Sequence, residues 1–261
     1  MTGQLIIMRH GQSEWTLPDV NRFAGWADVP LSAQGREQAR QAGRLVREAG
    51  LRPDLVFTSL LSRSIISANL LLDEIDRLWI PVERSWRLNE RHYGAFQGQT
   101  RPAMLDRYGP ERFATYRRSY DVAPPPIDSS SPYWQGSDPR YAACRSDGLD
   151  DRNPATITSE SLRDLGERLL PLWRARITPP LAQGRTVLVV THGSVVRSVV
   201  KCLEGVSDQD IRSINVPTGV PMVYDFQTGD ASAPHPNGPG RYLDPDAARA
   251  GMEQVAALGK G

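Results

Sequence analysis

The 261-residue sequence has few cysteines, few histidines and no long apolar run. Its two cysteines, Cys144 and Cys202, lie in dissimilar contexts, which gives neither a disulfide framework nor the spacing of a metal site. No apolar run approaches the roughly 20 residues that a membrane-spanning helix needs. The first residues also lack the basic and apolar regions of a signal peptide. We therefore expect a cytoplasmic protein without a membrane partner.

An excess of charge of one sign is likewise missing. The 31 Lys and Arg residues nearly balance the 30 Asp and Glu residues, so the total charge gives no reason to expect a nucleic acid or an anionic membrane as a partner. Local clusters of arginine are for the same reason more informative than the total. A chain of this length can bury the core of one large α/β domain or of two small ones.

Two apolar segments end in the same pair of residues. Residues 5–8 and 187–190 are rich in β-branched residues and are typical of strands buried on both faces. Arg9-His10-Gly11 follows the first segment, and Thr191-His192-Gly193 follows the second. A single His-Gly pair is more often a turn, because glycine can take a positive φ. Two pairs at strand ends, where open α/β sheets bind ligands, favour a shared site.

The order of the expected elements indicates the α/β class, with a mostly parallel central sheet and helices on both faces. Strands are expected at 5–8, 54–58, 80–83, 187–190 and 220–226, of which 80–83 lies at an edge because it contains Pro81. Helices are expected at 32–50, 59–78, from 158–161 to just before Pro179, and at 195–203 and 244–258.

We predict a single domain over residues 1–261, with a helical and loop insertion at about 89–154 and a C-terminal tail at about 229–261. Residues 122–154 contain a run of three prolines, a run of three serines and several aspartates. Such a long irregular stretch is usually either disordered or a cover over an active site.

An imidazole at a strand end could bind a metal, act as a base or attack an electrophile. Metal binding is the weakest of these, because no acidic or thiol cluster accompanies the two histidines. A serine hydrolase would need a Gly-x-Ser-x-Gly elbow, which the sequence lacks. Attack on phosphorus by a neutral His10 fits better, with Arg9, Arg63 and His192 around the phosphoryl oxygens.

Several further residues are candidates for the same site. Glu90 lies between an apolar segment and a glycine and is the best general acid–base, although a capping or surface glutamate is the ordinary alternative. Arg117 and Arg118 would usually form a solvated helix face. Near a phosphate site they could instead hold a second anionic group such as a carboxylate, together with Tyr93 and Arg101. We call Arg101, Arg117 and Arg118 the carboxylate clamp.

These residues together resemble the histidine phosphatase superfamily, whose signature is Arg-His-Gly. More narrowly, the sequence is similar to the cofactor-dependent (2,3-bisphosphoglycerate-dependent) phosphoglycerate mutases. Residues 85–95 (SWRLNERHYGA) and 116–121 (YRRSYD) point to the mutase branch, and residues 21–26, 58–63 and 216–221 extend the match over nearly the whole chain.

The resemblance implies a ping-pong phosphoryl transfer that interconverts 2- and 3-phosphoglycerate in glycolysis and gluconeogenesis. His10 would be the phosphorylated nucleophile and Glu90 would exchange the proton. The catalytic group would be His10, Glu90, His192, Arg9 and Arg63. The substrate would be bound by Ser13, Thr16, Ala24, Gly25, Tyr93, Arg101, Arg117, Arg118, Gly193 and Ser194. The cofactor implied is 2,3-bisphosphoglycerate without a metal, and the partners are phosphoglycerates and further copies of the chain in a dimer or tetramer.

Some positions depart from the family pattern. Thr16 and Ser194 stand where asparagine is usual, Ala24 where threonine is usual and Arg101 where lysine is usual, and the segment 17–21 is about two residues longer. The departures leave the nucleophile in place, but they could favour water as the acceptor. Two alternatives to the mutase therefore stay open. One is a phosphatase that uses the same phospho-His10, and the other is a non-catalytic protein that binds phosphate esters.

Overall fold

The computed structural model describes residues 2–142, 147–227 and 235–258. Its centre is a six-stranded sheet in the order β3-β2-β4-β1-β5-β6. The strands are β1 (Gly3–Arg9), β2 (Leu55–Thr58), β3 (Val82–Arg84), β4 (Thr186–Thr191), β5 (Met222–Phe226) and β6 (Arg241–Tyr242). Cys144 and parts of the predicted tail at 229–261 lie outside the described residues.

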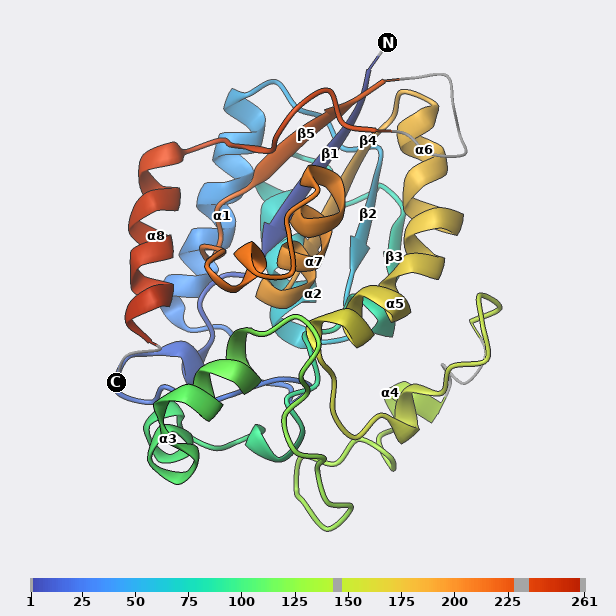
Figure 1. Cartoon of the computed structure of the whole chain (residues 1–261). Helices are drawn as coiled ribbons and strands as arrows, with labels where there is room; N and C mark the ends of the chain where they lie inside the picture. Colours follow the sequence, from blue (N-terminus) through green and yellow to red (C-terminus); the bar gives the residue numbers. More distant parts are fainter. Residues whose placement is uncertain (1, 143–146, 228–234, 259–261) are drawn as a thin grey trace.

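The predicted fold class is confirmed, since most strand pairings in the sheet are parallel. The pairs β1–β4, β4–β2 and β2–β3 are parallel, whereas β5 runs antiparallel to β1, and β6 antiparallel to β5. The strands β1, β2 and β4 all run from the end of the molecule near the N-terminus toward α3 (Figure 1). Their carboxyl ends therefore share one edge of the sheet.

The unbroken apolar run of β1 is explained by the helices that cover both faces. Because side chains alternate along a strand, Leu5 and Ile7 enter one core cluster, while Ile6 and Met8 enter the other. The first cluster lies under α5 (Leu162–Leu172), α6 (Thr178–Ala182) and α7 (Gly193–Glu204), and the second lies under α1 (Ala33–Glu48) and α2 (Ser62–Glu74).

The remaining helices lie at the margins of the sheet. They are α3 (Arg101–Arg118), α4 (Pro139–Ala142) and α8 (Pro245–Ala257). A break at Gly109, with φ of 73° just before Pro110, divides α3 into two pieces. The α8 helix lies along the outside of α1, and its C-terminal end reaches the side of the molecule that carries α3 (Figure 1).

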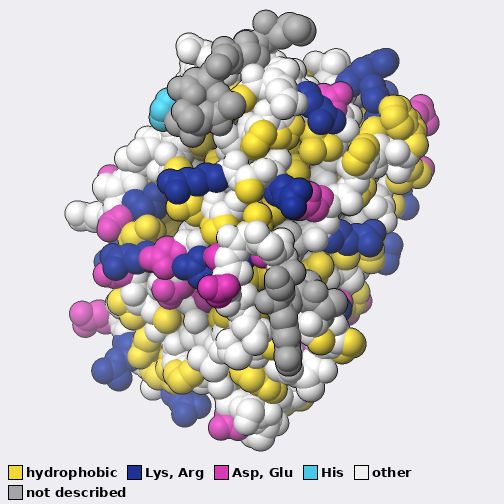
Figure 2. Space-filling model, turned by 90° about the vertical axis from the view of Figure 1, so that its right-hand side faces the viewer, with side chains coloured by type: hydrophobic (Ala, Val, Ile, Leu, Met, Phe, Trp, Pro, Cys, Tyr) yellow, Lys and Arg dark blue, Asp and Glu magenta, His cyan; other side chains and the backbone are white. Residues whose placement is uncertain are grey.

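On one face of the molecule, the charged side chains are of both signs, as the composition suggests. On the face formed by the right-hand side of Figure 1, basic and acidic side chains lie intermingled (Figure 2). Most of the ion pairs between described residues are partly exposed, such as Arg152 with Glu167.

The predicted bounds of two helices were wrong. The helix expected to end before Pro179 continues through a π-helical turn (Trp173–Ile177) into α6, because the two prolines there occupy the first turn of α6, where a missing N–H costs little. The helix expected at 59–78 spans only Ser62–Glu74 and is followed at Asp76 by a positive φ of 54°.

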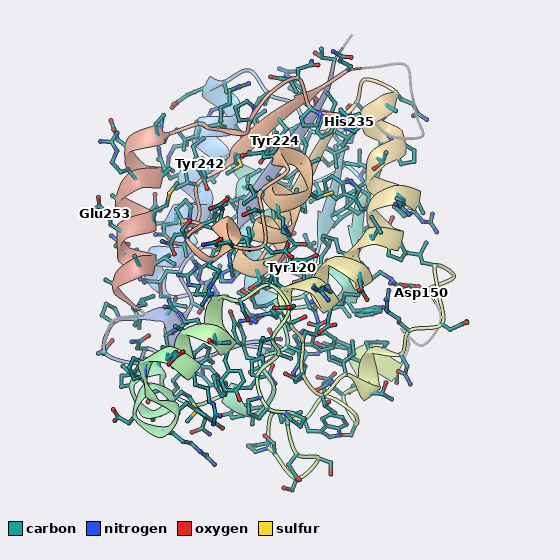
Figure 3. All side chains as sticks on the ribbon, viewed as in Figure 1. Tyr120, Asp150, Tyr224, His235, Tyr242 and Glu253 are labelled. Carbon is teal, nitrogen blue, oxygen red and sulfur yellow. The ribbon has the colours of Figure 1, made fainter. Side chains whose placement is uncertain are left out.

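The strand β6 was missed, since two residues carry no alternation. It pairs Tyr242 with Met222 of β5, and Tyr242 and Tyr224 lie on the same side of the fold (Figure 3).

Gly11 serves a different purpose from the one expected, since neither it nor Gly193 has a positive φ. A Cβ added at Gly11 would lie 2.0 Å from the carbonyl oxygen of Gly35, and one added at Gly35 would lie 1.9 Å from that of Gln12. The two glycines thus allow the first turn of α1 to pack directly against the backbone that follows β1.

We predict that Gly11→Ala lowers the free energy of unfolding by roughly 1–3 kcal/mol, because backbone must move to admit the methyl group. Urea denaturation followed by circular dichroism measures the change. Gly166→Ala is the matched control. Gly166 lies in α5, and a Cβ added there would meet only the Ser198 hydroxyl oxygen of α7, at 3.1 Å. Equal effects from the two substitutions would contradict the close approach at Gly11.

Candidate active site

The parallel pairing of β1 and β4 brings the two His-Gly pairs together. Arg9 is in register with Thr191, so His10 and His192 follow neighbouring strands at the same edge. Their ring centroids lie 4.9 Å apart at an interplanar angle of 64°, and both side chains are buried. The expectation that the two strand ends meet is therefore confirmed as geometry.

The hydrogen bonds of His10 determine which of its ring nitrogens carries the proton. Nδ1 lies 2.6 Å from the carbonyl oxygen of Gly11, and because a carbonyl only accepts, Nδ1 must carry the proton. Nε2 therefore carries no proton, and its lone pair accepts a hydrogen bond from Arg63 Nε at 3.3 Å. Arg63 is fixed in turn by donating to the carbonyl oxygens of Ala27 at 2.8 Å and Gly25 at 2.7 Å.

The surroundings keep both imidazoles neutral. Burial, followed by the charges of Arg63 and Arg9, holds the pKa of His10 well below its usual value. Burial and Arg63 lower the pKa of His192 in the same way. A neutral imidazole whose Nε2 carries no proton is the nucleophilic form of histidine.

His192 does not line the cavity in front of His10. Its Nε2 lies 2.7 Å from the hydroxyl oxygen of Ser59, and its buried Nδ1 has no hydrogen-bond partner. Sequence reasoning missed Ser59, which follows β2 directly at the same edge of the sheet. The contact of His192 with phosphoryl oxygens stays a prediction.

Glu90 is buried at the rim of the same cavity and is held through its main chain and side chain. Its Oε1 accepts from the backbone N–H groups of Arg91 at 2.9 Å and Ser194 at 3.1 Å. Ser194 is the second residue of α7, so the carboxylate lies at the positive end of that helix. The carbonyl oxygen of Glu90 accepts from the Trp26 indole at 2.6 Å. A surface glutamate is thereby excluded.

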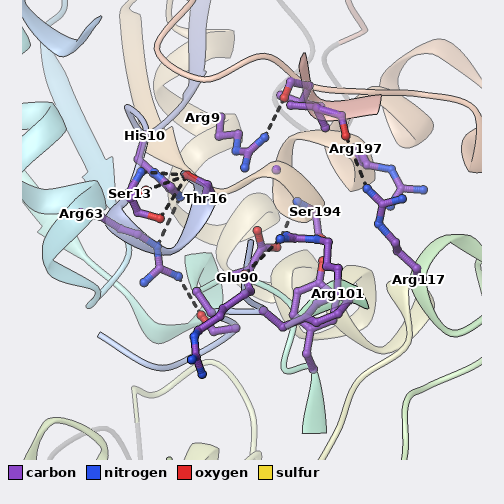
Figure 4. Close-up of a pocket in the computed structure, with 18 of the residues that line it drawn as sticks. Arg9, His10, Ser13, Thr16, Arg63, Glu90, Arg101, Arg117, Ser194 and Arg197 are labelled. Carbon is purple, nitrogen blue, oxygen red and sulfur yellow. Dashed lines mark hydrogen bonds between the residues drawn. The ribbon is translucent and has the colours of Figure 1, made fainter. Parts of the chain in front are cut away.

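The cavity contains many more cations than anions (Figure 4). Glu90 is the one acidic residue among the described residues that line it, whereas seven arginines do so, namely Arg9, Arg22, Arg63, Arg101, Arg117, Arg118 and Arg197. Burial lowers the pKa of Arg63 and Arg101 to about 10, and that of Arg117 and Arg197 to about 9. All of them stay cationic at neutral pH, so the cavity suits a ligand with several negative charges.

The carboxylate clamp is held from several elements. Arg117 Nη2 donates to the carbonyl oxygen of Val255 in α8 at 3.4 Å, and Arg118 donates to that of Ile214 at 3.2 Å. Tyr93 lies near the clamp, with the guanidinium of Arg91 4.5 Å from its ring centroid. Burial would raise the pKa of Tyr93, but the charges of Arg91 and Arg101 and a hydrogen bond with Ser194 together lower it.

Three of the residues that depart from the family pattern form side-chain hydrogen bonds with nearby residues. The Thr16 hydroxyl donates to the carbonyl oxygen of Ser13 at 2.9 Å, within a single 3-10 turn. Arg101 Nη1 donates to the Asn21 side-chain oxygen at 2.8 Å, and Asn21 itself adopts a positive φ of 43° in the lengthened loop. The Ser194 side chain is hydrogen-bonded with Tyr93.

All of the predicted site residues except His192 line this cavity. Those that sequence reasoning missed are Arg22, Phe23, Arg197, Val216 and Val255. Arg197 had a signal, since it lies three positions after Ser194 on the same face of α7. Val255 had none, because nothing in the sequence places α8 near the first loop. The catalytic and binding roles of these residues stay predictions.

Residues 2–142, 147–227 and 235–258 contain no group of three or more His, Cys, Asp or Glu side chains that could hold a metal ion. None of the helices in these ranges is long and apolar enough to cross a membrane.

The lowered pKa values of His10 and His192 predict a dependence of stability on pH. As the pH falls below about 6.5, His10 and His192 become protonated in the unfolded chain but stay neutral in the folded chain. The free energy of unfolding must therefore decrease. Urea denaturation between about pH 7 and pH 5 should show this decrease, and His192→Asn should make it smaller. The same slope in both proteins would contradict the effect of burial on His192.

Known proteins similar to this chain share its whole length. The family model of the histidine phosphatase superfamily (branch 1) matches residues 5–135 and 130–237. The 2,3-bisphosphoglycerate-dependent phosphoglycerate mutase of Leifsonia xyli subsp. xyli is 51% identical over 98% of this chain and 97% of its own length. Phosphoglycerate mutase 1 of Saccharomyces cerevisiae is 48% identical over 98% of this chain and 99% of its own.

The solved structures agree in fold. A mycobacterial glucosyl-3-phosphoglycerate phosphatase is 21% identical, with a TM-score of 0.66 over 92% of this chain and 96% of that chain. At this identity the likeness concerns the fold alone. The full-length relatives carry the assignment further, and on these grounds the chain belongs to the histidine phosphatase superfamily and, within it, to the family of the 2,3-bisphosphoglycerate-dependent phosphoglycerate mutases.

Proposed function

We propose that this chain interconverts 2-phosphoglycerate and 3-phosphoglycerate by ping-pong phosphoryl transfer through His10. The observation that carries the proposal is a neutral imidazole with an unprotonated Nε2, held by Arg63, beside an arginine-rich cavity with one buried carboxylate. Relatives about 50% identical over nearly the full length are named as mutases of this kind, which supports the same activity here.

His10 acts as the nucleophile on phosphorus. A bond forms between Nε2 and phosphorus while the bond from phosphorus to the leaving oxygen breaks, and the proton on Nδ1 stays there, hydrogen-bonded to the Gly11 carbonyl oxygen. Arg63 lies beside Nε2, and Arg9 has a buried Nε without a partner. Both guanidinium groups stabilise the negative charge on the phosphoryl oxygens in the transition state.

Glu90 moves the proton and the carboxylate clamp orients the substrate. The carboxylic acid gives its proton to the leaving oxygen, and the carboxylate then takes a proton from the hydroxyl group that attacks phospho-His10. Arg101, Arg117 and Arg118 bind the substrate carboxylate, which lets the glycerate turn and present its other hydroxyl group.

The residues present also fit 2,3-bisphosphoglycerate as the primer. Arg9, Arg101 and Arg197 each have a buried Nε without a hydrogen-bond partner, so the cavity offers donors to a ligand with more than one phosphate group. When bound, this compound supplies the phosphoryl group that first modifies His10. Arg101, Arg197 and the remaining clamp arginines would hold its second phosphate and its carboxylate.

A phosphatase that uses the same phospho-His10 is the second candidate. The Thr16 hydroxyl donates to its own turn, and Ala24 has no polar side chain, so two positions at the phosphate pocket offer no side-chain donor to the substrate. Fewer contacts to the glycerate would let water reach phospho-His10 and act as the acceptor.

The purified protein should convert 3-phosphoglycerate to 2-phosphoglycerate in a reaction that depends on added 2,3-bisphosphoglycerate and releases little phosphate. His10→Ala should lower this activity by at least about 10³-fold, because the covalent route is lost. Coupled assays of 2-phosphoglycerate and of free phosphate measure both products. Phosphate without 2-phosphoglycerate would replace the mutase by the phosphatase, and full activity of His10→Ala would refute the covalent mechanism.

We propose in addition that residues 1–261 act as one domain in the cytoplasm, as a homo-oligomer. One sheet with strands from Gly3 to Tyr242 supports the single domain. The edge strand β3 pairs only with β2 among the described strands. Three exposed apolar side chains, Leu78, Trp79 and Val82, lie in or just before β3, and they support an interface between copies there.

Trp79→Glu should therefore lower the apparent mass of the native protein by dissociating the oligomer, since Trp79 is 73% exposed in one chain. Analytical ultracentrifugation measures the mass. Leu170→Glu on α5, where the side chain is 37% exposed, is the control and should leave the mass unchanged. A monomeric wild type would refute the proposed oligomer.

A further inference from the structure

We propose that the buried ion pair of Arg168 and Glu160 positions Glu90 for its exchange of protons. This inference rests on the proposed function, because it assigns the pair a role in the proton step. Arg168 lies on α5, behind the segment that carries Glu90, and does not line the cavity.

Arg168 donates to four carbonyl oxygens in the segment from Trp86 to Glu90. Its Nη1 lies 2.5 Å from the carbonyl oxygen of Arg87 and 3.3 Å from that of Trp86. Its Nη2 lies 2.8 Å from the carbonyl oxygen of Asn89 and 3.0 Å from that of Glu90. One guanidinium group therefore sets the course of residues 86–90.

Glu160 completes the arrangement on the other side of Glu90. Its Oε1 accepts from Arg168 Nε at 2.5 Å, and its Oε2 accepts from the backbone N–H of His92 at 2.8 Å. The backbone N–H of Glu160 donates to the carbonyl oxygen of His92 at 2.9 Å. The ion pair thus holds the main chain both before and after the catalytic carboxylate.

The burial of this pair argues for a geometric purpose. The side chains of Arg168 and Glu160 are 1% and 4% exposed. Removing two such charges from water costs free energy that their attraction often fails to recover, so apolar residues would stabilise the fold as well or better. What apolar residues would not supply is a rigid fork that satisfies several carbonyl oxygens and fixes the Glu90 main chain.

Position matters for Glu90 because proton transfer requires its carboxyl oxygen to be within hydrogen-bond reach of the reacting oxygen. The Oε1 atom is already shared between the N–H groups of Arg91 and Ser194. A shift of the Glu90 main chain would exchange those contacts and move the carboxyl group relative to His10. Displacements of about 1 Å can lower a rate by roughly 10²-fold.

Arg87 provides a matched control, because it is as buried as Arg168 and is also ion-paired. It is fully buried and donates to Asp147 and Asp150, and Asp150 lies in the loop beside α5 (Figure 3). It also donates to the carbonyl oxygen of Arg168 at 2.9 Å, but no side-chain donor of Arg87 contacts residues 88–92. A purely structural role of buried arginines would make the two positions behave alike.

The experiment compares two phosphoryl donors in single-turnover labelling of His10. Labelling by 2,3-bisphosphoglycerate breaks a bond to an alcohol oxygen, which needs the proton from Glu90. Labelling by p-nitrophenyl phosphate releases a stable phenolate, which leaves without a proton. Arg168→Lys, which keeps the charge, should slow the first reaction roughly 10- to 100-fold and the second by less than about threefold. Glu90→Gln should show the same selectivity more strongly.

Arg87→Lys should slow both reactions alike or neither of them, with thermal unfolding as the check on stability. Where Arg168→Lys does not fold, Glu160→Gln decides by the same ratio of rates. Equal slowing of both donors in the Arg168 and Glu160 variants overturns the inference. A wild type that does not isomerise 3-phosphoglycerate removes the proposed function as well, so the two failures are distinguishable.

A second measurement separates positioning from substrate binding. With 3-phosphoglycerate as substrate, Arg168→Lys should lower kcat while leaving KM within about threefold, because the carboxylate clamp is untouched. A rise in KM with unchanged kcat would also overturn the inference.

Discussion

The parallel pairing of β1 with β4 is the interaction on which the rest of this structure depends. It places His10 beside His192, and it starts α7 at the point where the N–H of Ser194 meets Glu90. Gly11, which follows β1, and Gly35 of α1 let two backbone segments approach closely, so that α1 packs behind His10. The nucleophile, the second histidine and the acid–base thus derive their relative positions from a single register of hydrogen bonds.

The electrostatics of the cavity follow from burial more than from any single pair of charges. Desolvation lowers the pKa of the histidines and arginines together, but the two residue types start from very different values. The imidazoles therefore become neutral at physiological pH, whereas the guanidinium groups keep their charge. One physical effect yields both a nucleophile and a positively charged binding surface.

Much of the sheet and of the site was predictable, because local patterns encode it. Apolar β-branched runs marked the strands, and the motif residues marked the cavity wall, which includes every predicted site residue but His192. What the patterns lacked was information about distant contacts. No local signal placed Val255 beside Arg117 or Arg168 behind Glu90. The prolines that suggested an end before Pro179 were tolerated because they occupy the first turn of α6, which follows a π-helical turn.

The contact between Asn21 and the residue that follows α8 has a consequence for how the cavity is closed. The Asn21 side chain donates to the carbonyl oxygen of Leu258 across 237 positions of the sequence, and Arg117 contacts Val255 nearby. The rim of the cavity is therefore completed by residues far apart in the sequence, since Val255 lines it together with residues of the first loop. A chain without α8 would keep His10, Glu90 and the cavity arginines, but its cavity would be open on this side.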